Sequence, residues 1–214
     1  ADVRFTARSN GGHASAPPKN SPVARLAAFV DSMEKHPPFR KKFEPEVSAM
    51  FARLAAYAPF ALRLLFGNLW LFAPLMKLVM PALSPQAGAM LRTTAAFTML
   101  SGSDACNVLP QEASVWANLR FIPHQGMDES LALIKKRAEK YGIETEVLSA
   151  SDYSAPADIH GEAWRRVTDT IAEVFPGLAW SPYVMTGATD AKNYQAICDN
   201  CIRFAPVIYG PEQM

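Results

Sequence analysis

The order of hydrophobic patterns along residues 1–150 is the strongest constraint on how this chain can fold. Four segments have the alternation or the β-branched and aromatic content of strands, and two repeat apolar residues at helical spacing. The predicted strands are Val3–Ala7, Thr93–Leu100, Ala113–Phe121 and Glu144–Leu148, and the predicted helices are 22–33 and Asp128–Lys140. This order predicts a ferredoxin-like βαββαβ domain of the mixed α/β (α+β) class, with one antiparallel sheet and both helices on a single face.

Local signals mark the ends of the two helices. Ser21 is expected to cap the first helix, with Pro22 at its first position, and the proline pair at 37–38 ends it. Asp128 is expected to cap the second helix, and Gly142 to close it.

An insertion from about residue 37 to 91 separates the first helix from the second strand, and it is too long and apolar for a simple solvated loop. Its Leu64–Met76 stretch carries no charge but is bracketed by Arg63 and Lys77. Prolines 59, 74 and 81 are expected to break it, so a transmembrane helix is not predicted.

The insertion can be a helical subdomain that buries its apolar side against the lid or a second subunit. Alternatively, its apolar residues can line an entrance for an acyl chain or contact a membrane surface. These residues are Phe60, Leu64, Leu65, Phe66, Leu69, Trp70, Leu71, Phe72 and Leu75.

A second domain is predicted over residues 151–214, where the character of the sequence changes. A linker around 153–156 precedes a predicted helix at Glu162–Val174. Further predicted elements are a strand at Pro182–Met185, a loop at 186–190, a helix from Ala191 to about Ile197, and a strand at 203–207. Backbone N–H groups at the start of a helix can hold an anion, which makes the 186–190 loop a candidate binding element.

Composition excludes several classes of protein. Half of the residues are hydrophobic (50%), which allows a sizeable core, and the net charge of +1 arises from 21 basic and 20 acidic residues without long like-charge blocks. Nucleic-acid binding is therefore not predicted. The Cys198-x-x-Cys201 pair lacks the second pair of a four-cysteine zinc site, so these residues and Cys106 are expected to be free or buried thiols.

Three residues are candidates for catalysis or substrate binding. His13 follows two glycines, which let the backbone approach a ligand closely, and Asn107 and Arg120 could bind a carbonyl or carboxylate. Each has an ordinary alternative: a loop histidine, an Asx-turn asparagine and a surface arginine.

Together these residues resemble the lid-domain signatures of the zinc aminoacylase/carboxypeptidase superfamily. The matching motifs are Gly11-Gly12-His13-Ala14-Ser15-x-Pro17-Pro18, Asn107-Val108-Leu109-Pro110 and Asn118-Leu119-Arg120, in the family's order. The insertion, with Asn68-Leu69-Trp70-Leu71-Phe72 and Leu91-Arg92-Thr93-Thr94, is most similar to the carboxypeptidase S branch, which includes enzymes that act on N-fatty-acyl amino acids. The segments Thr186-Gly187-Ala188-Thr189-Asp190-Ala191 and Arg203-Phe204-Ala205-Pro206 are similar to a loop and strand late in the family's catalytic domain.

The resemblance implies a homodimeric dizinc amidohydrolase that cleaves N-acyl amino acids or dipeptides. In the family, a lid histidine, matched by His13, reaches into the partner's site and donates to the developing oxyanion. Asn107 and Arg120 match residues that bind the substrate's amide or carboxylate end. The matched loop residues Gly187, Ala188 and Thr189 are expected to hold the carboxylate from the other side. An exposed edge strand of the lid is expected to pair with a second copy.

The family's metal ligands do not match residues of this chain. In the family they lie N-terminal to the lid and after the Arg-Phe-x-Pro strand, and His36, His124 and His160 have no ligand spacing that would replace them. We therefore expect residues 1–150 to be a lid and 151–214 to be part of a catalytic domain, together a fragment with no metal site and no activity of its own. The alternatives are a non-catalytic module for dimerisation or small-ligand binding, and a membrane-surface protein. No compartment is predicted.

Overall fold

The computed structural model describes residues 1–187 and 189–204. The chain divides into two compact units. The first unit combines Ala1–Glu44 with Ala73–Tyr153, and the second combines Pro45–Phe72 with the described residues from Ser154 onward. The predicted domain boundary near residue 150 stays a prediction, and each unit is described by itself.

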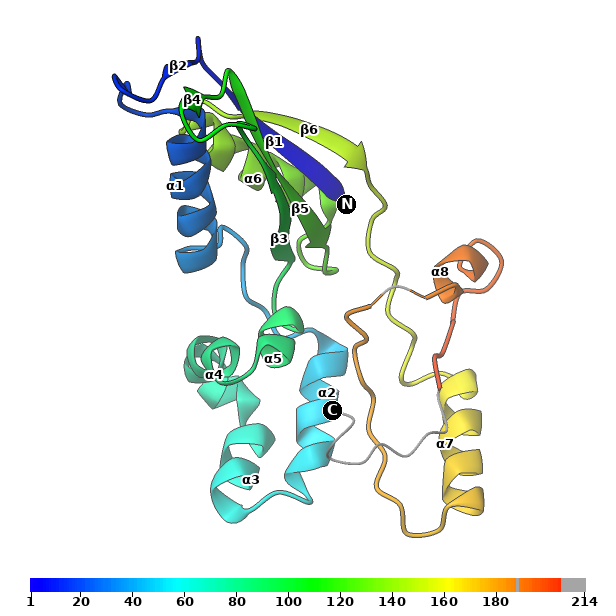
Figure 1. Ribbon diagram of the computed structural model, residues 1–214. Helices are drawn as coiled ribbons and strands as arrows, with labels where there is room; N and C mark the ends of the chain where they lie inside the picture. The colour runs from blue at the N-terminus through cyan, green and yellow to red at the C-terminus, as the bar shows by residue number, and fades with distance from the viewer. Residues whose placement is uncertain (188, 205–214) are drawn as a thin grey trace. The chain divides into compact units, whose positions relative to one another are not determined.

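A four-stranded antiparallel sheet organises the first unit (Figure 1). Its strands are β1 (Asp2–Arg8), β3 (Thr94–Ser101), β5 (Glu112–Arg120) and β6 (Glu144–Ser149), in the order β3-β5-β1-β6. Helix α1 (Pro22–Lys35) and the insertion separate β1 from β3 in the sequence, and β5 lies between these two strands in the sheet. The predicted fold class, helices combined with an antiparallel sheet, is confirmed.

Both helices pack on the same face of the sheet. Alternate residues of β1, among them Val3 and Phe5, are fully buried in a single cluster with residues of α1 and of α6 (Met127–Glu139). The Phe5 and Phe29 rings lie 4.9 Å apart, centroid to centroid, at the centre of this cluster. Figure 1 shows α6 behind the sheet and α1 beside it. The alternation predicted from the sequence therefore sorts apolar side chains toward the helices.

The opposite face of the sheet carries charged and hydroxyl pairs. Arg4 pairs with Glu146, its neighbour across the strands, and the Thr6 and Ser114 hydroxyls are 3.0 Å apart. The Arg4 and Glu146 side chains are exposed, whereas the hydroxyl pair of Thr6 and Ser114 is buried.

The predicted start of α1 is confirmed, whereas that of α6 is corrected. Ser21 Oγ accepts a hydrogen bond from the Ala24 N–H at 3.4 Å. Helix α6 begins one residue before Asp128, and Gly126 is its N-cap. The carboxylate of Asp152, which is distant in sequence, accepts from the Met127 N–H at 2.9 Å. Asp128 lies within the first turn, where its negative charge still favours the helix.

The insertion forms helices α2 (Pro45–Ala55), α3 (Phe60–Gly67), α4 (Leu69–Leu83) and α5 (Pro85–Ala89). Pro74 and Pro81 were expected to interrupt the helix formed by the apolar stretch. This expectation was wrong, because both prolines lie inside α4. Proline already has a helical φ, so each residue removes one backbone hydrogen bond without ending the helix. Within the described residues, no single helix is long and apolar enough to cross a membrane. Among the described helices, α3 and α4 are long and apolar enough only as a pair, and that pair is bent by 107°.

In the second unit, α7 (Glu162–Val174) confirms the predicted helix, and α8 (Ala191–Tyr194) is shorter than predicted. The strand predicted at Pro182–Met185 does not form, because no described segment pairs with it. Residues 203–204 of the last predicted strand are also unpaired, and the rest of it lies outside the described residues. A strand needs a neighbour for its backbone hydrogen bonds, and an apolar pattern alone cannot supply one.

A buried hydrogen-bonded pair, His124 and Glu44, lies in the first unit at the start of the insertion. His124 Nδ1 is 2.6 Å from Glu44 Oε1, and the two side chains are 4% and 10% exposed. His124 Nε2 is 3.0 Å from the Arg40 carbonyl oxygen. Both ring nitrogens therefore lie within hydrogen-bonding distance of an oxygen, which fixes the orientation of the ring. His124 is a loop residue, as predicted, but its pairing with Glu44 was not foreseen.

Candidate functional site

Two of the predicted site residues meet in a short ribbon beyond the end of the main sheet. Strand β2 (Gly12–His13) pairs with β4 (Val108–Leu109), and His13 lies opposite Val108. The Ala14 N–H donates to the Asn107 carbonyl oxygen at 3.0 Å. The Gly-Gly-His-Ala and Asn-Val-Leu-Pro motifs, distant in sequence, therefore form one local structure that presents both His13 and Asn107.

Gly11 makes the approach of these two segments possible. Its φ is +70°, a region that favours glycine, and an added Cβ would lie 2.9 Å from the Gln111 Cγ and 3.2 Å from the Leu109 carbonyl oxygen. A side chain at position 11 would force the ribbon apart. The sequence linked this glycine to the close approach of a ligand, and the structure shows that it also allows the two backbones to pack closely.

Hydrogen bonding sets the tautomer of the exposed His13 ring. The Ser15 N–H donates to His13 Nδ1 at 3.2 Å, and the Ser15 hydroxyl is 2.9 Å from the same nitrogen. Because a backbone N–H can only donate, Nδ1 is an acceptor, and in the neutral ring the hydrogen lies on Nε2. No described residue forms a hydrogen bond with Nε2, which leaves this N–H able to donate to a ligand. Sequence reasoning quoted Ser15 only as part of a motif and missed this role.

The Asn107 side chain is exposed, and no described residue forms a hydrogen bond with its amide. The turn that precedes β4 is held by other groups: Val108 N–H donates to the Ala105 carbonyl oxygen at 3.2 Å, and Ser103 Oγ accepts from Ala105 N–H at 3.3 Å. The side chain therefore does not act as an Asx-turn residue. Its amide remains able to donate to and accept from a ligand beside His13.

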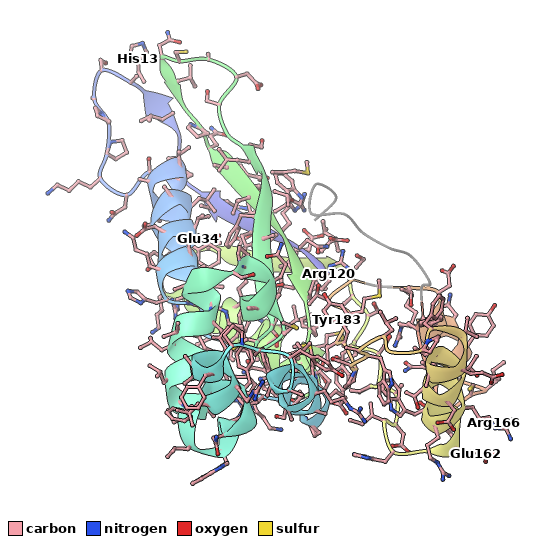
Figure 2. All side chains as sticks on the ribbon, turned by 90° about the horizontal axis from the view of Figure 1, so that it is seen from below. His13, Glu34, Arg120, Glu162, Arg166 and Tyr183 are labelled. Atoms are coloured by element: carbon pink, nitrogen blue, oxygen red, sulfur yellow. The ribbon has the colours of Figure 1, made fainter. Side chains whose placement is uncertain are left out.

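Arg120 lies at the opposite end of the sheet, as Figure 2 shows. Strand β5 runs from Glu112, next to the ribbon, to Arg120, and at about 3.3 Å per residue these ends are roughly 25 Å apart. Arg120 is exposed, and among the described residues none accepts a hydrogen bond from its guanidinium. The pKa of Asp2 nearby is lowered, first by hydrogen bonds from Asn118 and Ser149 and further by the Arg120 charge. The guanidinium is thus able to bind a carboxylate.

The candidate loop of the second unit is held by Arg203. Arg203 Nε donates to Thr189 Oγ1 at 3.0 Å, so the two motifs similar to a catalytic domain contact each other. Gly187 lies in an open bend, where an added Cβ would meet only Met185 Cε at 4.0 Å. Ala188 lies outside the described residues. Helix α8 after this loop has only four residues, so its dipole contributes little to anion binding.

The described part of the chain contains no cluster of candidate metal ligands. There, no three histidine, cysteine, aspartate or glutamate side chains form a group that could hold a metal ion. The three cysteines are free thiols, with Cys201 Sγ 3.5 Å from the Cys198 carbonyl oxygen. Burial, followed by the contact with Cys198, raises the pKa of the Cys201 thiol.

Residues 1–146 match the family model described as peptidase dimerisation domain. The chain belongs to this family, the dimerisation domains of M20 peptidases. The match covers β1, β3, β5 and the first three residues of β6, together with both helices and the ribbon that carries His13 and Asn107.

Relatives of this M20 dimerisation domain are hydrolases by name. The chain is 28% identical over 208 residues to "Probable carboxypeptidase S-like 2" of Dictyostelium discoideum, a match that covers 97% of this chain and 40% of the relative. It is 31% identical over 204 residues to the human "N-fatty-acyl-amino acid synthase/hydrolase PM20D1", covering 94% of this chain and 40% of the relative. The chain thus spans about 40% of the length of these relatives.

A solved structure supports the fold. An M20 family metallo-carboxypeptidase from Sulfolobus solfataricus matches with a TM-score of 0.55 at 15% identity, covering 91% of this chain and 53% of the other. At this identity the likeness concerns the fold alone.

We expect His13 of the M20 dimerisation domain to carry its hydrogen on Nε2. Long-range proton–nitrogen correlation spectra distinguish the two neutral tautomers, and Nδ1 should give the shift of an unprotonated nitrogen. His160 is the control, because no described residue forms a hydrogen bond with its ring, and it should show a mixture of tautomers. A His13 spectrum with hydrogen mainly on Nδ1 would contradict the assignment.

Proposed function

We propose that this chain is the lid and dimerisation part of a dizinc amidohydrolase that hydrolyses the amide bond of N-acyl amino acids or dipeptides. The proposal extends the family membership to the reaction of the full-length protein. The match to carboxypeptidase S-like and N-fatty-acyl-amino acid hydrolase relatives supports this substrate class.

The separation of His13 from Arg120 is the observation that carries the proposal. His13 and Asn107 lie together, and Arg120 is at least roughly 25 Å away along β5. The scissile amide and the carboxylate of one amino acid are only a few bonds apart, so a single chain cannot place both ends of the sheet against them. In a homodimer both ends of the sheet can meet one substrate, because one chain supplies His13 and Asn107 while its partner supplies Arg120.

Each residue then has a distinct chemical role. His13 donates its Nε2 hydrogen to the oxygen that becomes negative as the amide is attacked, where a preorganised donor is most effective. The Asn107 amide binds the substrate's amide or carboxylate beside it. Arg120 of the partner binds the carboxylate through two parallel hydrogen bonds. The loop at Gly187, Ala188 and Thr189 holds the carboxylate from the other side.

Zinc enters the proposal through the resemblance alone. The described residues do not fit a metal centre, so no role in binding zinc is assigned to them. The steps assigned to this chain are hydrogen-bond donation and the positioning of substrate. We expect the chain by itself to be inactive.

Mixing two inactive variants of the full-length protein tests the shared site. His13→Ala and Arg120→Ala homodimers should each hydrolyse N-acyl amino acids poorly. After subunit exchange, half of the dimers combine the two variants, and one of their two sites has both intact residues. Activity should therefore rise to about one quarter of the wild-type value.

The matched control mixes His13→Ala with Asn107→Ala. Both changes affect the same ribbon, so every mixed dimer has one altered residue in each site and activity should stay low. If the His13 and Arg120 variants fail to complement after exchange is verified by mass, the shared site is wrong. Single variants with wild-type turnover would instead favour a non-catalytic dimerisation or ligand-binding module.

A further inference from the structure

An exposed apolar surface lies on α3 and the residues on either side of it, within the second unit. We call it the α3 surface, and it comprises Tyr57, Phe60, Leu64, Trp70 and Leu71. Phe60 and Trp70 are each 81% exposed, and Tyr57 is 70% exposed. Large aromatic side chains at this exposure on neighbouring segments are a feature of surfaces that bind a partner.

Helix α3 is apolar in sequence but contributes no buried residue to the described structure. All of its residues except Arg63 and Gly67 are hydrophobic. Phe66, half-buried, packs on Phe51 of α2 with the ring centroids 4.9 Å apart. This contact attaches one side of α3 to α2 and leaves the other side outward.

The segment that forms the α3 surface carries charge of a single sign. Residues 47–72, which belong to the second unit, include Arg53 and Arg63 but no aspartate or glutamate. In the second unit, Arg63 is exposed within α3 itself, and its guanidinium reaches only a backbone oxygen, that of Ala56, at 3.2 Å. An apolar surface with cations and no anions is complementary to an anionic interface.

We propose that the α3 surface docks on an anionic lipid surface, with Phe60, Trp70 and their neighbours inserted among the headgroups and acyl chains. Tryptophan and tyrosine favour this boundary, because their rings are apolar and their N–H or O–H groups remain near water. Helix α3, with eight residues, is too short to cross a bilayer and suits an orientation along its plane. A second copy is a poorer occupant, because it would place like charges together.

Co-sedimentation of the full-length protein with vesicles tests the docking. Wild-type protein should bind vesicles of phosphatidylcholine mixed with phosphatidylglycerol more strongly than vesicles of phosphatidylcholine alone. The Phe60→Ser/Trp70→Ser variant should lose about a hundredfold in partitioning, because two large apolar side chains no longer insert. Arg63→Glu should lose about tenfold on the anionic vesicles only.

Val174→Ser is the matched control, because Val174 is also exposed (59%) but lies on α7, away from the α3 surface in sequence. It should bind vesicles as the wild type does. The proposal is overturned if wild-type protein does not sediment with the anionic vesicles, or if the double variant binds them equally well. It is also overturned if the double variant changes only the size of the assembly in solution, which would identify a second copy as the occupant.

Discussion

His13→Ala in the full-length protein is expected to lower the turnover of N-acyl amino acids by about 10²–10³, the usual loss when one oxyanion donor is removed. The reason is the fixed tautomer, in which Ser15 accounts for Nδ1 and leaves the Nε2 hydrogen for the substrate oxygen. Hydrolysis rates at matched zinc content measure the effect. Because the donor acts on the transition state, KM should change much less than kcat.

Two further variants test whether the loss of turnover comes from the missing N–H donor of His13. His13→Gln retains an N–H donor and should recover part of the lost turnover. His160→Ala removes another exposed histidine and should leave the turnover unchanged. Wild-type turnover in His13→Ala would reduce His13 to an ordinary loop residue and would favour the non-catalytic module.

Glu44→Ala or His124→Ala is expected to lower the free energy of unfolding by about 3 kcal/mol or more, because each leaves a buried polar or charged partner without its counterpart. The two side chains are 10% and 4% exposed and 2.6 Å apart. Gln125 nearby is also buried and accepts from the Arg40 N–H at 2.8 Å, so the loss should weaken a connected set of hydrogen bonds. Urea denaturation followed by circular dichroism measures the change.

A double-mutant cycle and an exposed salt bridge serve as controls for this stability loss. The Glu44→Ala/His124→Ala variant should lose less stability than the sum of the single losses, because neither partner is left alone. Lys35→Ala removes an exposed pair with Asp31, in which the side chains are 66% and 59% exposed, and should cost about 0.5 kcal/mol or less. Equal losses for the buried and exposed pairs would contradict the interpretation.

The sequence predicted the elements of the first unit well, because their patterns depend on neighbours along the chain. Alternation in β1 and β5 indicated which residues face the core, and Ser21 with Pro22 marked the start of α1. It also identified the motifs that carry His13 and Asn107. Segments without a partner strand were predicted less well, and Pro182–Met185 is the example.

By itself, the sequence determined the class of fold and the family, since hydrophobic periodicity and ordered motifs are properties of the chain. The tertiary structure decided which distant groups meet: Asp152 at the start of α6, Glu44 beside His124, and His13 beside Asn107 but far from Arg120. The physical reason is that hydrogen bonds and ion pairs act over a few ångströms, whereas the residues that form them can be a hundred positions apart. Only the packed sheet and its ribbon bring such groups together or keep them apart.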